Sequence, residues 1–552
     1  MRKSDHVKRL DFSDEFLLDS AEKRLQSGDY LGALTVLNKR SAMYDPSADA
    51  SALYADVYEA MELWPLAADA WFRFLDTCNE ADFAEGYEGL AVVFMNMGND
   101  LQSALYYHRA LALDKTREED EEVEFETVEP SRPHLRLVHS EDDDPELIRR
   151  GLGLLKEGEL EEARNSLLEV SEKSADYPSA AGLAAMCSLM LGEEESAERE
   201  CERLLEKHPD NIQALTTYCA VLGSRGNKDG AREAAKKLAL LPTKGLDDLY
   251  RVATALCETG LHEEAFEKLT ELKKKLPYDE NVLYFHAVAG YHTGKLKEAI
   301  ASLETLTTIF PRKAVAKYYL VRMRELRDGT GEKFPMNYYY RMPEEEYRTI
   351  ADFFLAVSSA DEDRLQEYAA LPVLEEYLRL AFDEMEGRDD KLQMLAIKVA
   401  NKTRSDGFLR EILLDCNGNE LIKLAVLHDL TVRNEDNSFG TVVCNLYKEF
   451  FTRQIEVGAR KRGVFLKAFA DVYAKFALLD EAHEGKICAA AEDVYESLAE
   501  AGAWEYLDER TAVAAAIYRE ARLTRGERDI EEIARMFEAP VATVKKILDF
   551  MM

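Results

Sequence analysis

One glycine and one alanine recur together every 34 residues through the middle of this chain. Stepping back from Gly294 in units of 34 reaches four more glycines, and the same steps from Ala299 reach four more alanines. The glycines are Gly158, Gly192, Gly226, Gly260 and Gly294, and the alanines are Ala163, Ala197, Ala231, Ala265 and Ala299. With average glycine usage of about 7%, five in one register by chance is on the order of one in a million. A fixed period of this size is typical of a solenoid of stacked helical or strand units.

The residues around each glycine and alanine predict a pair of antiparallel helices. Apolar residues recur at helical spacing before Gly226 and again after it, and glycine most easily adopts the left-handed conformation that ends a helix. Ala231 then faces Cys219 on the preceding helix. Because both side chains are small, the helix axes can approach closely, and a bulkier residue there would cost about 1–3 kcal/mol. Pro311 marks the end of a second helix, since proline cannot continue one.

These offsets resemble the tetratricopeptide repeat, whose 34-residue unit carries a small residue, Gly, an aromatic or Leu, Ala and a final Pro at the same places. Five contiguous units fit residues 145–311, and residues 312–328 predict the closing helix that the end of a solenoid needs. A less regular set of about three units fits residues 1–115, where Gly28 and Ala33 fall in register. The resemblance implies an all-α, tetratricopeptide-type helical solenoid.

The rest of the chain divides by composition and periodicity. The expected parts are an amino-terminal tetratricopeptide-like array at 1–115, an acidic linker at 116–144, the five-repeat array with its capping helix at 145–328, an irregular all-α domain at 329–480, and a carboxy-terminal segment at 481–552. The stretch GTGEKFPMNYYYRMP, which opens the fourth part, breaks the helical pattern. After Pro343, amphipathic helical segments alternate with short polar turns and show no 34-residue register.

The carboxy-terminal segment resembles one repeat of the cyclin box of transcription initiation factor B, which leads into a helix-turn-helix. In DIEEIARMFEAPVATVKKIL, Ala534 takes the tight position between two helices, Glu538 the turn, and Val544 the anchor of the second helix. The family pattern favours Gly at the turn, so Glu538 departs from it. The residues that would face a DNA major groove are Thr543, Lys545 and Lys546. Ordinary packing of three helices produces the same pattern, and we favour it over DNA binding.

Charge and composition limit the classes of partner that this chain can bind. The net charge of −36 and pI near 4.8 work against non-specific attachment to nucleic acid or to anionic membranes. No stretch approaches 18 uncharged apolar residues, so we expect no membrane span. The eight cysteines include no C-x-x-C pair, and the first residues lack the apolar region of a signal peptide. We therefore expect an acidic, cytoplasmic protein.

Motifs that carry catalysis are missing from the sequence. It contains no G-x-S-x-G, H-E-x-x-H or complete G-x-G-x-x-G, and GTGEK lacks the spacing of a phosphate-binding loop. His262 follows Glu258 by four residues, but Gly260 between them favours an exposed turn over a metal-binding pair. We expect no enzyme activity, no cofactor and no metal.

The tetratricopeptide resemblance implies a concave groove, lined by the first helix of each repeat, that accepts a peptide. Carried onto this sequence, the candidate groove residues are Met186, Met190, Tyr250, Glu258, Tyr284, Tyr291 and His292. The tyrosines and His292 gather toward one end of the array, and amphipathic aromatic residues are common anchors in protein interfaces. Alternatively, some of these tyrosines fill the spaces between adjacent repeats.

The sequence thus predicts a non-enzymatic scaffold or adaptor that binds a protein or peptide partner in the groove. The alternative is a transcription-linked regulator, in which the repeats sense a partner and the carboxy-terminal helix-turn-helix contacts DNA. We disfavour nucleic acid as a partner and expect no membrane. The sequence assigns neither a named partner nor an oligomeric state, because a fold does not dictate a function.

Overall fold

A computed structural model of the whole chain describes residues 12–113, 144–383, 391–479, 481–523 and 529–551. The chain is organised as two compact units, and each is described below by itself. Unit 1 comprises Met1–Asp120 together with Glu344–Met552, and unit 2 comprises Glu121–Pro343. The predicted acidic linker, 116–144, lies outside the described residues except for Asp144, which begins a helix.

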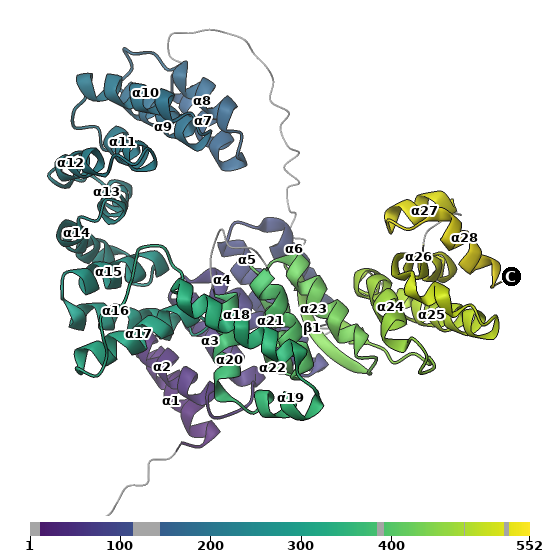
Figure 1. Cartoon of the computed structure of the whole chain (residues 1–552). Helices are drawn as coiled ribbons and strands as arrows, with labels where there is room; N and C mark the ends of the chain where they lie inside the picture. The colour runs from purple at the N-terminus through teal and green to yellow at the C-terminus, as the bar shows by residue number, and fades with distance from the viewer. Residues whose placement is uncertain (1–11, 114–143, 384–390, 480, 524–528, 552) are drawn as a thin grey trace, which may run out of the picture. The chain divides into compact units, whose positions relative to one another are not determined.

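Unit 2 is a row of antiparallel helix pairs that ends in a single helix (Figure 1). Its helices are α7 (Asp144–Glu157), α8 (Leu160–Leu168), α9 (Tyr177–Met190), α10 (Glu194–Lys207), α11 (Ile212–Ser224), α12 (Lys228–Ala239), α13 (Leu246–Glu258), α14 (His262–Lys275), α15 (Glu280–His292), α16 (Leu296–Ile309) and α17 (Ala314–Arg327). Residues 144–343, all of which the structure describes, contain no strand. The predicted helical solenoid is confirmed.

The periodic glycines end the first helix of each pair in a left-handed conformation. The φ angles are 83° at Gly158, 79° at Gly192, 77° at Gly226, 69° at Gly260 and 77° at Gly294. At Gly226 the backbone forms the hydrogen bonds of a Schellman-type cap, since Asn227 N donates to Leu222 O at 2.8 Å and Gly226 N donates to Gly223 O at 3.0 Å. The 34-residue glycine spacing therefore follows from the backbone conformation of the turn.

The periodic alanines lie where the two helices of a pair cross. Ala231 and Cys219 are both buried, and the Cys219 thiol lies 3.6 Å from the Ala231 carbonyl oxygen. Where the first helix carries Gly151 instead, a Cβ atom would meet Leu167 at 2.7 Å. Small residues at these crossings let the paired helices approach closely, as the sequence predicts.

A buried polar network joins α14, α15 and α16. Lys273 Nζ donates to Ser302 Oγ at 2.6 Å, Ser302 Oγ lies 2.9 Å from His286 Nδ1, and His286 Nε2 lies 3.2 Å from Thr270 Oγ1. Burial, with a smaller contribution from Lys273, lowers the pKa of His286 to about 4. Ser302 is completely buried, so no substrate can reach its hydroxyl. The network satisfies polar groups in the core.

The amino-terminal part of unit 1 consists of three further helix pairs. Its helices are α1 (Asp14–Gln26), α2 (Tyr30–Ser41), α3 (Ala48–Ala60), α4 (Trp64–Thr77), α5 (Phe83–Asn96) and α6 (Asp100–Leu113), with the short 3-10 helix η1 (Glu80–Asp82) before α5. Gly28 and Gly98 have positive φ angles of 78° and 71°. Glu62, which follows Gly28 by 34 residues, adopts the same conformation with φ of 59°. The turn geometry is thus kept where the glycine is absent.

The remainder of unit 1 is helical except for one hairpin. Its elements are α18 (Glu344–Ser359), α19 (Glu362–Ala369), α20 (Pro372–Phe382), α21 (Lys391–Lys402), α22 (Asp406–Leu414), α23 (Glu420–Val432), β1 (Asn437–Val443), β2 (Leu446–Thr452), α24 (Arg462–Phe476), α25 (Glu481–Glu500), η2 (Trp504–Asp508), α26 (Arg510–Ala521), α27 (Ile530–Met536) and α28 (Val541–Asp549). Among the described residues, no helix combines the length and the apolar composition needed to cross a bilayer.

The hairpin is the main departure from the helices expected at 329–480. Strands β1 and β2 pair antiparallel, from Asn437 opposite Thr452 to Val443 opposite Leu446. The two connecting residues, Cys444 and Asn445, have positive φ angles of 52° and 60°, as a type I′ turn requires. Such turns are usually marked by Asn-Gly or Asp-Gly, so the Cys-Asn pair conceals the hairpin from sequence analysis.

Helix side chains bind the outer edge of β1. At three alternate residues of the strand, one outward backbone group accepts from or donates to a helix side chain. The pairs are Ser438 O with Arg410 Nη2 at 2.6 Å, Gly440 N with Asp76 Oδ1 at 3.0 Å, and Val442 O with Lys423 Nζ at 2.5 Å. An open strand edge is a template for pairing with another chain, and these side chains occupy it.

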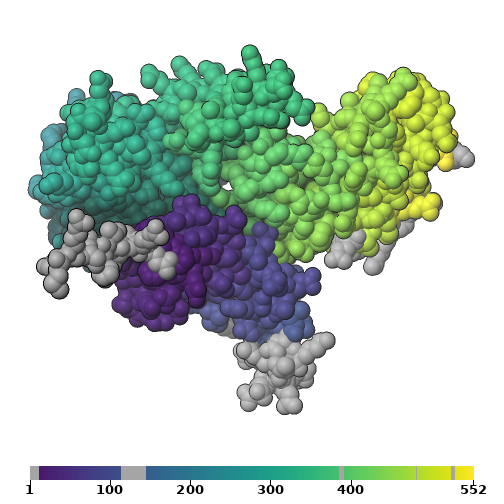
Figure 2. Space-filling model, turned by 90° about the horizontal axis from the view of Figure 1, so that it is seen from below, coloured from purple at the N-terminus to yellow at the C-terminus, as the bar shows by residue number. Residues whose placement is uncertain are grey.

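Tyrosine hydroxyl groups bind the turn and the outer edge of β2. Tyr106 on α6 donates to Asn445 O at 2.7 Å and accepts from Tyr447 N at 3.0 Å, and Tyr473 on α24 donates to Phe451 O at 2.6 Å. The hairpin is therefore fixed to the amino-terminal repeats of its own unit. Figure 2 shows the purple and blue surface of these repeats directly adjoining the green surface of the later part of unit 1.

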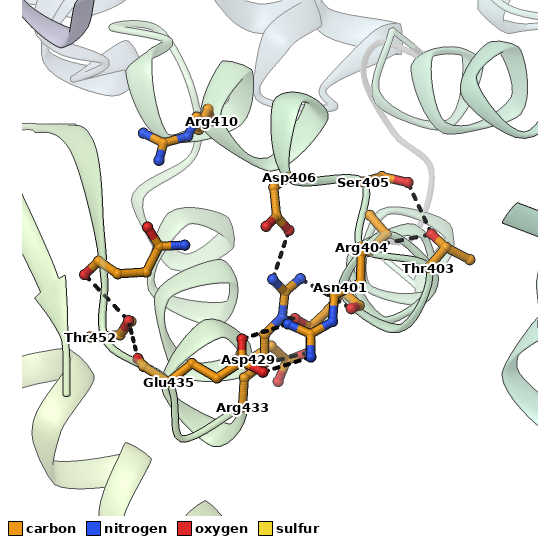
Figure 3. Close-up of polar contacts among 12 residues, drawn as sticks. Asn401, Thr403, Arg404, Ser405, Asp406, Arg410, Asp429, Arg433, Glu435 and Thr452 are labelled. Carbon is orange, nitrogen blue, oxygen red and sulfur yellow. Dashed lines mark hydrogen bonds and ion pairs between the residues drawn. The ribbon is translucent and has the colours of Figure 1, made fainter. Parts of the chain in front are cut away.

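Two arginines fix the helices that precede the hairpin (Figure 3). Arg433 donates to Asp406 Oδ1 at 2.7 Å and to the Asn401 carbonyl oxygen at 3.0 Å. Arg404, which has a positive φ of 60°, makes two parallel bonds of 2.6 and 2.7 Å to Glu435. Asn401 and Asp406 lie on α21 and α22, Arg404 follows α21, and Arg433 and Glu435 follow α23. The network therefore connects these three helices just before β1.

The last helices pack around α26. Its residues Ala512 to Tyr518 are all buried, and α24, α25 and α28 lie against it. Between α27 and α28, Glu538 has a positive φ of 54°, and Ala534 and Val544 are fully buried. These three residues occupy the turn and packing positions expected of them, while the helix-turn-helix assignment stays a prediction.

Replacing Gly226 by Ala is expected to destabilise unit 2 by about 1–2 kcal/mol, because a side chain disfavours the left-handed conformation. No atom lies within 4 Å of the added Cβ, so backbone strain alone is tested. Gly223 on the same helix also has open space around it and no positive φ. Gly223→Ala should therefore be neutral or stabilise by about 0.5–1 kcal/mol. Urea unfolding followed by circular dichroism compares the two, and equal shifts would contradict this account of the turn.

Tyr106→Phe is expected to loosen the hairpin, because it leaves Tyr447 N–H and Asn445 C=O without their shared partner. An unsatisfied buried backbone group costs about 1–3 kcal/mol. Hydrogen exchange followed by mass spectrometry should show faster exchange across 437–452. Tyr107→Phe is the matched control, since Tyr107 lies on the same helix with its ring beside His108. Unchanged exchange in Tyr106→Phe would show that the hydroxyl does not hold the hairpin.

The array of unit 2 is expected to lose stability in mild acid through His286. The folded pKa is lowered from 6.5 to about 4, so the stability from the neutral ring is full above the unfolded pKa and falls as the pH drops toward the folded one. Linkage predicts a loss of about 2 kcal/mol at roughly pH 5. The midpoints of urea unfolding, measured at neutral pH and at roughly pH 5, test this. His286→Gln should show a flatter pH dependence, and an identical one would refute the assignment.

Candidate peptide-binding face

The predicted groove residues lie on first helices of unit 2, which form the inner side of the arc of helices in Figure 1. We call the exposed side of the first helices α7, α9, α11, α13 and α15 and of α17 the inner face. Met186 and Met190 are on α9, Tyr250 and Glu258 on α13, and Tyr284, Tyr291 and His292 on α15. The α15 residues lie on one helix, and the α9 residues lie three repeats before them.

A segment of the chain itself lies on the inner face at α15. This segment, residues 331–343, follows α17 and is here called the internal loop. Its main-chain carbonyl oxygens accept hydrogen bonds from a row of side chains on α15 and α17. The pairs are Phe334 O with Tyr291 OH at 2.7 Å, Met336 O with His292 Nε2 at 2.8 Å, Asn337 O with Tyr284 OH at 3.1 Å, and Arg341 O with Tyr319 OH at 2.8 Å.

These bonds identify the donor and acceptor atoms of Tyr291 and His292. Phe334 N also donates to Tyr291 OH at 2.9 Å, so this hydroxyl both donates to and accepts from one residue of the loop. A carbonyl oxygen can only accept, so Nε2 of His292 carries a hydrogen. The inner face thus presents donors to an extended main chain.

The aromatic side chains of the internal loop pack against aromatic residues of the array. The Phe334 ring stacks on Tyr291 with centroids 4.7 Å apart, and its centroid lies 5.8 Å from that of Tyr319. Tyr340 meets Tyr284 edge to face at 4.9 Å. Only 2% of Tyr284 is exposed. In this conformation, therefore, Tyr284 packs beneath the loop and contacts solvent hardly at all.

Tyr338 is the loop residue that reaches furthest along the array. Its hydroxyl lies 2.9 Å from His262 Nδ1, and its ring packs against Phe285 and the buried core of α11 to α15. The His262 and His292 rings stack with centroids 4.2 Å apart. Burial, followed by the charges of His292 and Arg232, lowers the pKa of His262. Burial also raises the pKa of the Tyr338 hydroxyl, so Tyr338 is a neutral hydrogen-bonding group.

The two predicted residues on α13 lie beside this cluster. Tyr250 is half-buried against the same core, and burial together with the nearby Asp279 carboxylate raises the pKa of its hydroxyl. Glu258 keeps an exposed side chain, and desolvation by the surrounding protein raises the pKa of its carboxyl.

Of the two predicted residues on α9, Met190 is exposed and Met186 is half-buried. Met190 is 59% exposed and occupies the same repeat position as His292, since 292 − 190 = 102, which is three times 34. Met186 is half-buried, and its sulfur accepts a hydrogen bond from Gln213 Nε2 at 3.8 Å. On α7, Leu152 is 41% exposed. This part of the inner face therefore carries exposed apolar side chains.

Sequence analysis missed the internal loop as a component of the inner face. The break in helical periodicity at 329–343 was visible, but a broken period does not say where the chain goes next. A signal was available: four aromatic residues, Phe334, Tyr338, Tyr339 and Tyr340, fall within seven positions of a non-helical stretch. Such residues seldom crowd into a solvated loop, because exposing them forfeits burial of apolar area.

The candidate DNA-contacting residues lie on α28 in unit 1. Lys545 and Lys546 are exposed, and Thr543 is half-buried. Lys545 Nζ lies 3.8 Å from Glu531 Oε1 on α27, so part of its charge is balanced within the chain.

One side-chain group among the described residues has ligand atoms close enough for a metal ion. Ligand atoms of Asp69, Asp415 and Cys416 lie within 4.8 Å of one another. Asp69 Oδ1 already accepts the backbone N–H of Cys416 at 3.0 Å. Burial and the Asp69 carboxylate raise the pKa of the Cys416 thiol. The hydrogen bond joins α4 to the residues that directly follow α22.

Comparison with known proteins identifies the repeat. Residues 154–241 match the family described as tetratricopeptide repeat. No curated protein matched the chain.

Several solved structures are similar to this chain at low identity. Pseudomonas aeruginosa pilF is 17% identical over 48% of this chain and 93% of its own, with a TM-score of 0.20. A tetratricopeptide repeat protein from Parabacteroides merdae is 17% identical over 52% and 97%, with a TM-score of 0.25. The P58(IPK) tetratricopeptide domain is 15% identical over 58% and 99%, with a TM-score of 0.17. These scores carry no argument about function. The repeat match and the helix pairs of unit 2 agree, and the chain contains tetratricopeptide repeats arranged as a helical solenoid.

Proposed function

We propose that this protein is a non-enzymatic interaction scaffold that binds a partner polypeptide on the inner face of unit 2, at α7 and α9. The observation that supports this most directly is the exposure of Leu152 and Met190 on that face. Methionine is enriched in protein interfaces relative to the rest of the surface. Toward the other end of the array, Tyr284, Tyr291 and His292 already bind the internal loop.

We place the protein in the cytoplasm. All eight cysteines lie within the described residues, and all eight are free thiols. Cys187, Cys201, Cys219 and Cys257 are buried between repeat helices. Buried thiols in an array without disulfides fit a reducing compartment.

Regulation through DNA contact is the weaker candidate. The exposed Lys545 and Lys546 favour it, but Glu531 lies beside Lys545 and the chain carries a net charge of −36. Phosphate neutralisation supplies most non-specific DNA affinity, and this surface offers little of it.

A photo-crosslinking residue placed at position 190 of the full chain is expected to capture a partner polypeptide. The same residue at position 240 should not, although Leu240 is 86% exposed, because it follows the second helix α12. A peptide synthesised from the captured sequence is then titrated by calorimetry. Met190→Glu should weaken its binding by about tenfold or more, and Leu240→Glu should leave it unchanged. Equal effects of the two variants would contradict the proposed site.

A further inference from the structure

We propose that the inner face of α13, α15 and α17 is a second, exchangeable peptide site, and that the internal loop is its resident ligand. A partner segment of the same chemistry, extended, aromatic and weakly basic, would replace the loop there. This inference rests on the proposed scaffold function and deepens it by naming the class of ligand.

The first support is the direction of the hydrogen bonds. Four bonds to main-chain carbonyl oxygens of the loop have their donors on the array, at Tyr284, Tyr291, His292 and Tyr319. One bond runs the other way, from Phe334 N to Tyr291 OH. Every polypeptide carries such carbonyls. The donors therefore recognise an extended main chain and do not depend on which side chains it bears.

The second support is a set of three places for aromatic side chains. Phe334 packs between Tyr291 and Tyr319, Tyr338 packs against His262 and Phe285, and Tyr340 packs on Tyr284 with Lys313 Nζ 5.2 Å from its ring centroid. These contacts select the side chains that the main-chain bonds do not. A replacing segment needs aromatic residues at matching intervals of four and two positions.

The third support is the pattern of exposure along the loop. Lys333, Pro335, Tyr339 and Arg341 are exposed, whereas Met336 and Met342 are buried. The loop thus lies on the array with one side only, as a bound peptide does, and no second layer of the unit covers the exposed positions. Its two basic residues and one acidic residue, Glu332, give a net charge of +1 in a strongly acidic chain.

Exchange is favoured over simple release of the loop. Without an occupant, the rings of Tyr284 and Phe285 and the hydroxyl donors would be left facing water over an apolar surface. Burying that surface again is favourable for any segment that fills it. A second polypeptide therefore competes with the loop for the same contacts.

The test uses a fluorescent synthetic peptide with the sequence of residues 331–343, added in trans to the full chain. In the double variant Phe334→Ala, Tyr338→Ala the resident loop loses two aromatic contacts, so the peptide should bind at least about tenfold more tightly than to the wild type. The matched control is Lys333→Ala, Tyr339→Ala, which alters two exposed loop positions and should behave as the wild type. A peptide with Ala at the positions of Phe334 and Tyr338 should not bind.

A second arrangement avoids relying on the stability of the double variant. A protease site inserted after Thr330 of the otherwise unchanged full chain allows the loop to be cut at its amino-terminal end. After cleavage the labelled peptide should bind more tightly than before, and the unlabelled peptide should displace it. Absence of peptide binding in both arrangements, or equal binding to wild type and double variant, overturns the proposal.

The results of these peptide experiments can be distinguished from the results of the crosslinking experiment at position 190. Failed peptide exchange with normal crosslinking at position 190 overturns only the loop as an exchangeable ligand. Equal effects at positions 190 and 240, together with normal peptide exchange, overturn only the proposed binding site at α7 and α9.

Discussion

Hydrogen bonds from tyrosine hydroxyl groups to main-chain carbonyl oxygens hold several of the described segments that are not helical. They recur in both units. The pairs are Tyr44 with Phe12, Tyr106 with Asn445, Tyr284 with Asn337, Tyr291 with Phe334, Tyr319 with Arg341, Tyr473 with Phe451 and Tyr495 with Gly458. A helix satisfies its own backbone groups, but an extended segment packed on helices cannot, and each unsatisfied buried group is costly. Tyrosine suits this task because its ring packs in the apolar layer while its hydroxyl reaches the main chain.

The same constraint explains why each unit contains a polypeptide segment bound to repeat helices. In unit 1 the hairpin lies on α4 and α6, through Asp76 and Tyr106. In unit 2 the internal loop lies on α15 and α17. Stacked helix pairs leave a continuous surface that the repeats themselves do not cover. In this chain, part of that surface binds extended segments of the chain itself.

Sequence alone predicted the parts whose geometry is local. The glycine period follows from the left-handed turn at residues such as Gly226, and the small pair Cys219 and Ala231 follows from the helix crossing; both are properties of one 34-residue unit. The hairpin escaped prediction because Cys444 and Asn445 adopt a turn that usually needs glycine.

The candidate site was predictable in position but not in occupancy. Periodicity places Tyr284, Tyr291 and His292 on the inner face, since all lie on a first helix. It does not show that residues some 40 to 55 positions later return to hydrogen-bond with them, because such a contact leaves no periodic trace. Likewise, Tyr106 and Tyr447 meet across 341 positions of sequence. Contacts of this range depend on the whole arrangement of helices and are not encoded in a local pattern.

The neutral character of these contacts bears on how a chain of net charge −36 recognises polypeptides. Exposed ion pairs contribute about 0–1 kcal/mol and are screened by salt, whereas buried hydroxyl-to-carbonyl bonds are not. When one extended segment replaces another, the number of such bonds is conserved, because both segments carry the same backbone carbonyls. The hydrogen bonds therefore contribute affinity without distinguishing between ligands. The site therefore distinguishes one polypeptide from another by the side chains at the positions of Phe334, Tyr338 and Tyr340. The rings around these three positions differ in shape and polarity.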